Sequence, residues 1–223
     1  MASLKNKIVY SARYEQFETS DKKDGAKLVG PDNAIGDIGT IVIESITTDA
    51  EKLKLRAFVQ NSFGQRIGYL SDATSSELAA FKNKGWHLSY ILSLVAFSEQ
   101  PKPERFWGEI IFFVFDPSIY DEIEVFISRT AQQVAQGKRP NIDLSDSSLK
   151  DLISAKGAWD AGGHIEQPPI DKHTAILKSS RSFHDKLLDG ARSKNPGCLI
   201  VGWLFILGIA SLIIYVLYKG NIL

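Results

Sequence analysis

The sequence predicts an α+β domain followed by one membrane-spanning helix, and three observations lead to this prediction. Runs rich in β-branched and aromatic residues occupy much of the first half of the chain. Segments with helical spacing of apolar residues lie between these runs and after them, which is typical of an α+β fold. The last long segment is apolar and uncharged over a length that spans a bilayer.

Three strands are predicted first along the chain. Residues 38–47 are rich in Ile, Val and Thr and form the first strand, preceded by a partly extended N-terminal segment, residues 1–37. Residues 53–60 and 65–70 form a hairpin, because the connecting Asn61-Ser62-Phe63-Gly64 places a glycine where a positive φ is required.

A short helix and two long strands follow the hairpin. Thr74 and Glu77 form a capping box that opens the helix, and Gly85 is its expected C-terminal cap. Residues 86–98 and 106–115 are predicted strands. Neither alternates cleanly between apolar and polar residues, which indicates that both are buried on two faces for part of their length.

Two trailing helices complete the predicted domain. A helix over Asp116–Gln136 begins at an Asp-Pro pair and ends at Gly137. Ser145 caps a second helix over residues 146–156. We therefore place the soluble α+β domain at residues 38–159.

Residues 160–197 have the composition of a linker, with paired glycines, paired prolines and a basic excess after residue 170. Lys172–Leu188 is a candidate helix within it. Residues 171–194 include six basic and three acidic residues, which gives the segment a net positive charge. The segment therefore either rests on anionic headgroups or forms a solvated stalk whose charges set the topology. The basic residues that would face lipid are Lys178, Arg181, Lys186, Arg192 and Lys194.

A transmembrane helix is predicted over Cys198–Tyr218. These 21 residues carry no charge. As a helix they would be about 31 Å long, which matches a hydrocarbon core of about 30 Å. Trp203 near one end, and Tyr215 and Tyr218 near the other, occupy positions where aromatic rings prefer the headgroup region. A short tail, residues 219–223, follows the span.

The charges beside the span predict its orientation. Basic residues are concentrated before the span, and Lys219 alone follows it, so the N-terminal domain is expected in the cytoplasm. The first residues of the chain include no apolar run of signal-peptide length. Because only residues 219–223 follow the span, we expect insertion after translation, as in a tail-anchored single-pass membrane protein.

The composition argues against several classes of function. With 26 basic and 26 acidic residues, the chain has no net field that would steer it toward nucleic acid. A single cysteine, Cys198, excludes an internal disulfide framework and a cysteine-rich zinc site. The sequence contains no phosphate-binding, dinucleotide-binding or metalloprotease motif, and its four histidines have no metal-ligand spacing. We therefore predict no cofactor and no metal.

One loop and one basic cluster remain as candidate interaction sites. Trp159, Asp160 and His164 lie among several glycines and are either a small recognition loop for a protein partner or a flexible exit from the domain. Lys138 and Arg139 could contribute to a basic face, but acidic residues interleave with the basic ones, which argues against nucleic-acid binding.

The order of elements from residue 53 to residue 85 resembles the core of HIRAN domains. A strand with Leu55-Arg56-Ala57-Phe58-Val59 leads through a glycine turn to Ile67-Gly68-Tyr69-Leu70, a capped helix and Lys84-Gly85. The resemblance implies a small, mostly antiparallel β-barrel-like domain of the kind that holds a single-stranded DNA end. It implies that Gly68 lets another backbone approach and that Tyr69 is half-buried.

The resemblance is incomplete at one point. HIRAN domains carry an Asn-Pro-(Tyr/His)-Asp-x-Asn-Ala segment before the first of these strands, and this chain has Thr48-Asp49-Ala50-Glu51-Lys52-Leu53-Lys54 there. The polar contacts of that segment are missing, so the resemblance carries the fold but not DNA-end binding.

Three functions are compatible with these patterns. The leading hypothesis is a non-enzymatic adaptor that recruits a protein partner to the lipid bilayer. The second is a membrane-tethered enzyme whose site is assembled from dispersed residues, for example around Trp159–His164. The third is a HIRAN-like binder of nucleic-acid ends. An apolar surface would favour the first, convergent acids and a histidine the second, and an aromatic groove with basic residues the third.

Overall fold

The computed structural model describes residues 10–47, 53–100, 102–178 and 219. It divides the chain into two units, Met1–Arg181 and Ser182–Leu223, and the first contains the folded domain. No helix among the described residues is both long and apolar enough to cross a membrane. The predicted span, residues 198–218, lies outside the described residues, as do Arg181, Lys186, Arg192 and Lys194.

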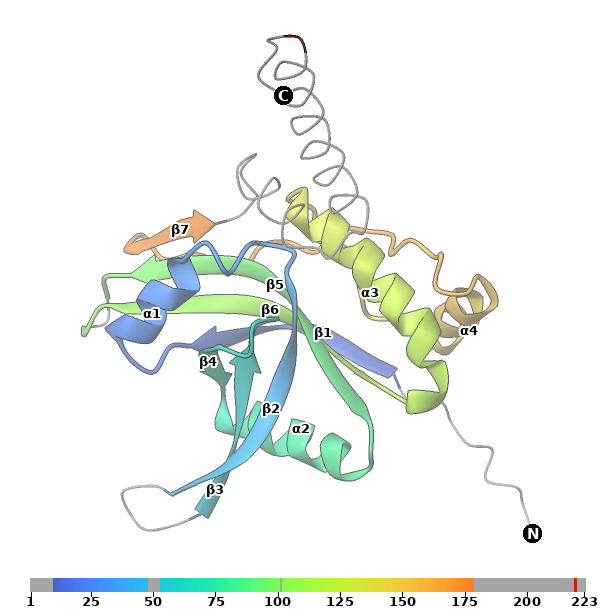
Figure 1. Ribbon diagram of the computed structural model, residues 1–223, viewed down its shortest axis with the longest axis horizontal. Helices are drawn as coiled ribbons and strands as arrows, with labels where there is room; N and C mark the ends of the chain where they lie inside the picture. The colour runs from blue at the N-terminus through green and yellow to red at the C-terminus, as the bar shows by residue number, and fades with distance from the viewer. Residues whose placement is uncertain (1–9, 48–52, 101, 179–218, 220–223) are drawn as a thin grey trace. The chain divides into compact units, whose positions relative to one another are not determined.

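Six antiparallel strands form a closed barrel in the order β2-β3-β4-β1-β6-β5, and pairing of β2 with β5 closes it. A seventh strand, β7, pairs with β5 beyond the β2 contact, on the edge of β5 that faces away from β6 (Figure 1). The α+β, barrel-like fold expected from the sequence is confirmed. The strands are β1 (Tyr10–Glu18), β2 (Ile38–Thr47), β3 (Leu53–Gln60), β4 (Arg66–Leu70), β5 (His87–Ser98), β6 (Arg105–Phe115) and β7 (Thr174–Lys178).

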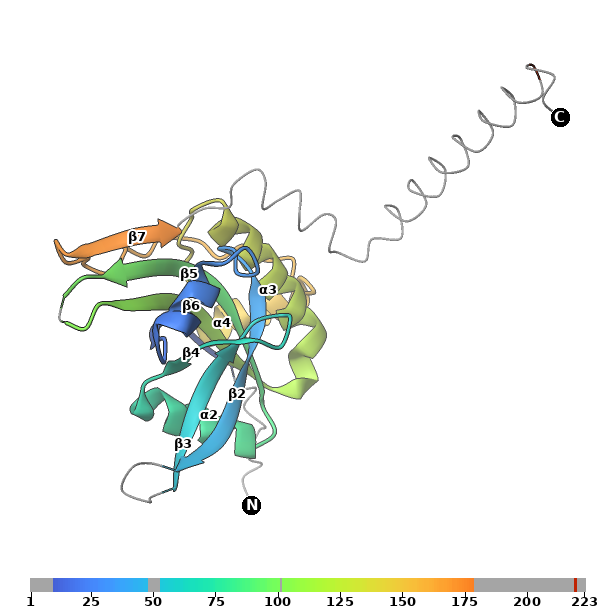
Figure 2. The ribbon, with the colours of Figure 1, turned by 60° about the vertical axis from the view of Figure 1, so that its left-hand side comes forward.

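Helices pack on two different parts of this barrel. The helix α2 packs against β3 and β5, at the opposite end of the barrel from β7 (Figures 1 and 2). The helix α3 lies on the outer face of the sheet, where Phe126 packs edge-on against Phe113 of β6. The helices are α1 (Lys22–Val29), α2 (Asp72–Asn83), α3 (Tyr120–Ala135) and α4 (Asp146–Ser154), and a 3₁₀ turn (Pro117–Ile119) precedes α3.

Phe17 fills the barrel where two glycines make room for it. The ring of Phe17 is fully buried and lies against the positions that a Cβ atom at Gly68 or Gly108 would take. A Cβ at Gly68 would also come within 2.5 Å of the carbonyl oxygen of Glu18. Gly68 therefore permits close approach of β1 and β4, as predicted, and Tyr69 is half-buried, as predicted.

Most predicted strands agree closely with the structure, and one helix start is corrected. The strands β2 and β3 have the predicted bounds. The helix α2 begins at Asp72 rather than at the predicted capping box, because Ser71 accepts a hydrogen bond from the Thr74 amide and caps it. The Thr74 hydroxyl donates to Glu15 instead. Glu77 pairs with Arg13 at 2.8 Å, so both residues of the expected box connect α2 to β1.

The folded unit extends beyond the predicted boundaries of 38 and 159 on both sides. The strand β1 lies between β4 and β6 in the barrel, although we expected only a partly extended segment before residue 38. Thr174–Lys178 form β7 rather than part of the expected helix Lys172–Leu188, because they pair with the edge of β5 that β2 leaves open. The described residues after 159 therefore belong to the domain and not to a linker.

We predict that Gly68→Val destabilises the domain by about 1–3 kcal/mol, because the new side chain must displace the Phe17 ring or the β1 backbone. The measurement is thermal unfolding of the purified chain. Gly162→Val is the matched control, since a Cβ atom there meets nothing within 4 Å. Equal melting temperatures for the two variants would contradict the close approach at Gly68.

Candidate functional site

The barrel closes through a short contact between β2 and β5. Only Ile38, Gly39 and Thr40 of β2 pair with β5, whereas β2 pairs with β3 from Thr40 to Thr47. A Cβ atom at Gly39 would come within 2.5 Å of both the Gln60 carbonyl oxygen and the Tyr90 ring. The glycine therefore lets the two strands meet, and they separate immediately beyond Thr40.

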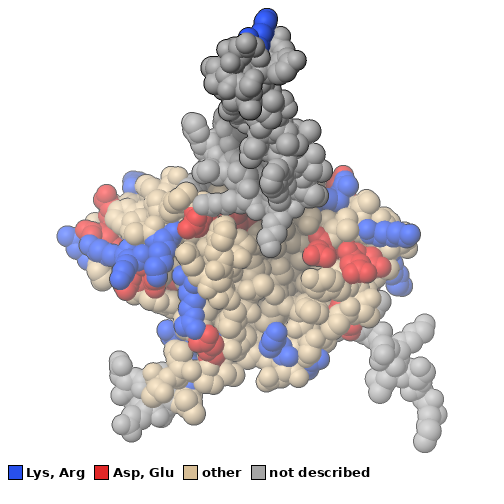
Figure 3. Space-filling view, viewed as in Figure 1, with Lys and Arg blue, Asp and Glu red and all other residues tan. Residues whose placement is uncertain are grey.

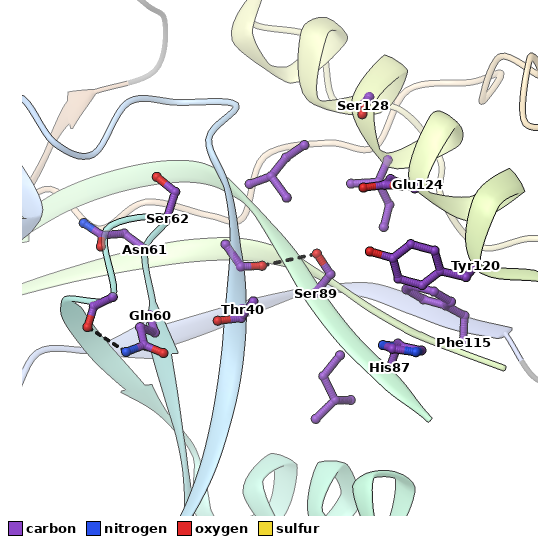
Figure 4. Close-up of a pocket in the computed structure, with 15 residues that line it drawn as sticks. Thr40, Gln60, Asn61, Ser62, His87, Ser89, Phe115, Tyr120, Glu124 and Ser128 are labelled. Carbon is purple, nitrogen blue, oxygen red and sulfur yellow. Dashed lines mark hydrogen bonds between the residues drawn. The ribbon is translucent and has the colours of Figure 1, made fainter. Parts of the chain in front are cut away.

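A groove of about 510 Å³, here called the seam groove, lies over this contact. Its two sides are the turn between β3 and β4 and the helix α3, and its floor comes from β2 and β5 (Figure 4). The lining residues are Ile38, Gly39, Thr40, Gln60, Asn61, Ser62, Gly64, His87, Leu88, Ser89, Phe115, Tyr120, Glu124, Ile127 and Ser128.

His87 is the lining residue with the best-known catalytic chemistry, and its contacts are aromatic. Its ring stacks on Phe115 with centroids 5.6 Å apart and meets the edge of Tyr120 at 4.9 Å. Among the described residues, His87 makes no hydrogen bond to a carboxylate or hydroxyl group. The neighbouring Ser89 hydroxyl donates to the carbonyl oxygen of Gly39. The groove therefore lacks the base–nucleophile pair that acyl-transfer chemistry requires.

The lining of the seam groove combines apolar side chains with many hydrogen-bonding side chains and one charge. Glu124 is the only charged residue among those that line it. Asp121 and Glu122 precede it in the first turn of α3. The hydroxyl of Tyr120 points into the groove toward Ser89 (Figure 4). Such a lining suits an uncharged or cationic ligand and repels phosphate groups.

A second groove of about 690 Å³, here called the lateral groove, lies between β1, β4 and the segment that precedes β7. The Arg56 guanidinium lies 4.5 Å above the ring centroid of Tyr69, whose hydroxyl donates to Glu18. Arg105 pairs with Glu18 at 2.8 Å, and Arg56 lies 3.7 Å from Asp72. Acidic residues therefore offset both arginines of this groove.

A buried ion pair fixes the segment after α3 to the outer face of the barrel. Arg139 and Glu109 are 2.7 Å apart, with only 8% and 5% of their side-chain surfaces exposed. Ser93 donates a hydrogen bond to Glu109, and the Tyr14 ring lies 4.3 Å from the Arg139 guanidinium. Arg139 is therefore not part of a surface basic face. On the face shown in Figure 3, basic and acidic residues also intermingle.

Two tyrosines of β1 add to this attachment. The hydroxyls of Tyr10 and Tyr14 donate to the carbonyl oxygens of Ile142 and Pro140. Burial raises the pKa of both hydroxyls well above the ordinary value, so they stay protonated as donors. The backbone after α3 is therefore held at successive points across β1.

The structure does not bring the three predicted loop residues together into a site. Trp159 packs against Phe126 of α3 with ring centroids 6.0 Å apart. Asp160 pairs with Arg129 at 2.7 Å, and His164 is exposed. Trp159 and Asp160 thus attach the loop to α3. Lys178, the predicted lipid-facing residue within the described chain, is the last residue of β7.

The sequence reasoning missed the residues of the seam groove because barrel closure assembles them. Ile38, Ser89 and Tyr120 belong to three elements, and no local spacing connects them. Comparison with protein-family models, curated proteins and solved structures finds no match to this chain. Among the described residues, no group of three or more His, Cys, Asp or Glu side chains is placed to hold a metal ion.

We predict that Arg139→Met costs about 3–5 kcal/mol of unfolding free energy, because it leaves Glu109 charged and buried without its partner. Adding Glu109→Leu should restore most of the loss, since the double variant buries no charge. The measurement is denaturant-induced unfolding of the purified chain. Asp160→Asn, which breaks an exposed ion pair, is the control and should cost no more than about 1 kcal/mol. A double variant as unstable as Arg139→Met alone would contradict this account.

Proposed function

We propose that this chain is a tail-anchored, single-pass membrane protein whose α+β domain acts as an adaptor. In this proposal the seam groove binds a protein partner and the anchor holds that partner at the bilayer, without catalysis. The observation that carries the proposal is the groove itself. It is open, its lining combines apolar and hydrogen-bonding side chains, and among its lining residues the histidine has aromatic contacts in place of catalytic hydrogen bonds.

The anchor and its tether complete the proposal. Residues 198–218 span the membrane, the basic flank keeps the N-terminal domain in the cytoplasm, and residues 219–223 form the tail. The strand β7 ends at Lys178, so residues 179–197 connect the domain to the span. That length reaches at most roughly 65 Å when fully extended. Lys178, Arg181, Lys186, Arg192 and Lys194 add contacts with anionic headgroups.

A second candidate function is the nucleic-acid-end binding that the HIRAN resemblance suggests. Tyr69, from the Ile-Gly-Tyr-Leu motif, lines the lateral groove with Trp107 and Arg56, and aromatic rings beside arginine are suited to stacking on bases. Glu15, Glu18, Asp72 and Asp171 line the same groove and oppose a phosphate backbone. The adaptor therefore remains the preferred function.

We predict that deleting residues 198–223 moves the protein from the membrane pellet to the soluble fraction, because the uncharged 21-residue segment is removed. Cell fractionation with carbonate extraction measures this change. The full-length chain is the control and should resist extraction. A truncated chain that still pellets after carbonate treatment would contradict a single C-terminal anchor.

We predict that Ser128→Trp removes the partner from the full-length chain, because the indole fills the seam groove from an exposed position on α3. Proximity labelling in cells, compared with the parent chain, identifies the proteins lost. Ser147→Trp is the matched control, since Ser147 is exposed on α4 and does not line the groove. If both variants retain the same labelled proteins, the seam groove is not the partner site.

An oligonucleotide titration separates the two candidate functions. A fluorescent single-stranded oligonucleotide can be titrated against the detergent-solubilised chain and against Tyr69→Ala. Binding that Tyr69→Ala abolishes and Ser128→Trp leaves unchanged would favour the lateral groove and the nucleic-acid function. We expect no oligonucleotide binding at moderate salt, because acidic residues line both grooves.

A further inference from the structure

The strand β2 has an open edge directly below the seam groove. From Ile41 to Thr47 it pairs with β3, and no other described strand pairs with its second edge. Figure 1 shows β2 and β5 diverging on this side of the seam. In an antiparallel strand, alternate residues direct their main-chain N–H and C=O groups toward each neighbour. This edge therefore offers a row of hydrogen-bonding groups to an added strand.

The face beside this edge exposes two leucines together with Ser45 and Thr47, and it becomes buried at Ala57. Opposite pairs Ile43–Ala57, Ser45–Leu55 and Thr47–Leu53 place these side chains on the face that continues the inner surface of the barrel. Leu53 is 79% exposed and Leu55 is 41% exposed. A strand added to β2 would direct every second side chain onto this face. Apolar residues at alternate positions would cover it.

The negative charge at the α3 end of the seam groove favours a basic residue in the bound segment. Glu124 lines that end, Asp121 and Glu122 precede it on α3, and no Lys or Arg is among the lining residues. A basic side chain entering between α3 and the seam would face a carboxylate without meeting another cation. An acidic side chain or a phosphate group would be repelled there.

We propose that the partner binds as one extended segment that pairs with the open edge of β2. The segment carries apolar residues at alternate positions and a Lys or Arg that faces Glu124 at the α3 end. This inference rests on the proposed adaptor function and names the chemistry of its partner.

The first test selects peptides from a phage-displayed random heptapeptide library on the full-length chain in detergent. We expect enriched sequences that alternate apolar residues and include Lys or Arg, and we expect Ser128→Trp to prevent their binding. Glu124→Lys should weaken them by about tenfold, the size expected for loss of one charge pair at a desolvated contact. Glu166→Lys, an exposed charge reversal outside the groove, should leave their affinity unchanged.

The second test asks whether the main chain of the peptide is used. Selected peptides are synthesised with one N-methyl group at each position in turn, and their affinity is measured by fluorescence anisotropy. Strand addition predicts an alternating pattern, with losses of about tenfold at every second position, because only alternate N–H groups face β2. A loss of affinity at every position, or at no position, would contradict strand addition.

The outcomes separate this inference from the adaptor function. Ser128→Trp could prevent binding of peptides that lack the basic residue or the alternating pattern of affinity losses. That result would overturn the inference and keep the groove as a partner site. Failure to enrich any sequence, or binding unaffected by Ser128→Trp, would overturn the inference. If Ser128→Trp also retains all labelled proteins in cells, the adaptor function fails as well. Concentration-dependent dimers that the peptides dissolve would identify a second copy of this chain as the occupant and contradict the proposal.

Discussion

The short contact between β2 and β5 is the constraint on which the shape of this domain depends. Three residue pairs close the barrel, and Gly39 allows them because any side chain there would collide with Tyr90 and the Gln60 carbonyl. A longer contact would have closed the groove above the seam and occupied the edge of β2 below it. A shorter one would leave the β5 edge that faces away from β6 without a paired strand from His87 to the start of β7 pairing at Val95.

The buried ion pair between Arg139 and Glu109 has a different role from the apolar core. Desolvation of two charges offsets much of their attraction, so the pair contributes little net stability compared with apolar residues of the same volume. It does fix one arrangement, because Arg139 can neutralise Glu109 only when the segment after α3 crosses β1 at Tyr14. The backbone N–H of Ile165 donates a hydrogen bond to the carbonyl oxygen of Arg139, so the chain that leads to β7 is attached at the same point.

Local patterns predicted most elements of the fold, and long-range pairing explains those that were missed. The β-branched run at residues 38–47 and the glycine turn at Gly64 need no distant partner to be recognised, and both agree with the structure. The strand β1 was missed because Arg13 and Glu15 interrupt its apolar pattern. These charges pair with each other and with Glu77 and Thr74 of α2, which is distant in the sequence. The same reason applies to the expected helix at Lys172–Leu188, since pairing with β5 overrides local helix propensity at Thr174–Lys178.

The candidate site was less predictable than the fold for a related reason. His87 is an exposed strand residue whose ring lies against Phe115 and Tyr120, and no local sequence pattern connects these three residues. The groove that contains it arises from the turn after β3, the start of β2 and the first half of α3, which meet only after the barrel closes. Trp159 and Asp160 looked like a recognition loop because an aromatic, an acid and several glycines are adjacent, but this composition also suits a loop that packs back on its own domain.

The proposed anchor and the proposed strand addition complement each other energetically. The open edge of β2 offers only a few main-chain hydrogen bonds, each worth about 1 kcal/mol net. Association in solution costs about 4–15 kcal/mol of translational and rotational freedom, so edge pairing alone gives weak binding. A partner that is itself at the membrane meets the tethered domain at a high effective concentration, which lowers that cost without any new contact. A groove with low affinity is then sufficient for binding at the bilayer. The same groove binds little of the same segment when that segment is free in the cytoplasm, so the proposed anchor contributes to specificity as well as to location.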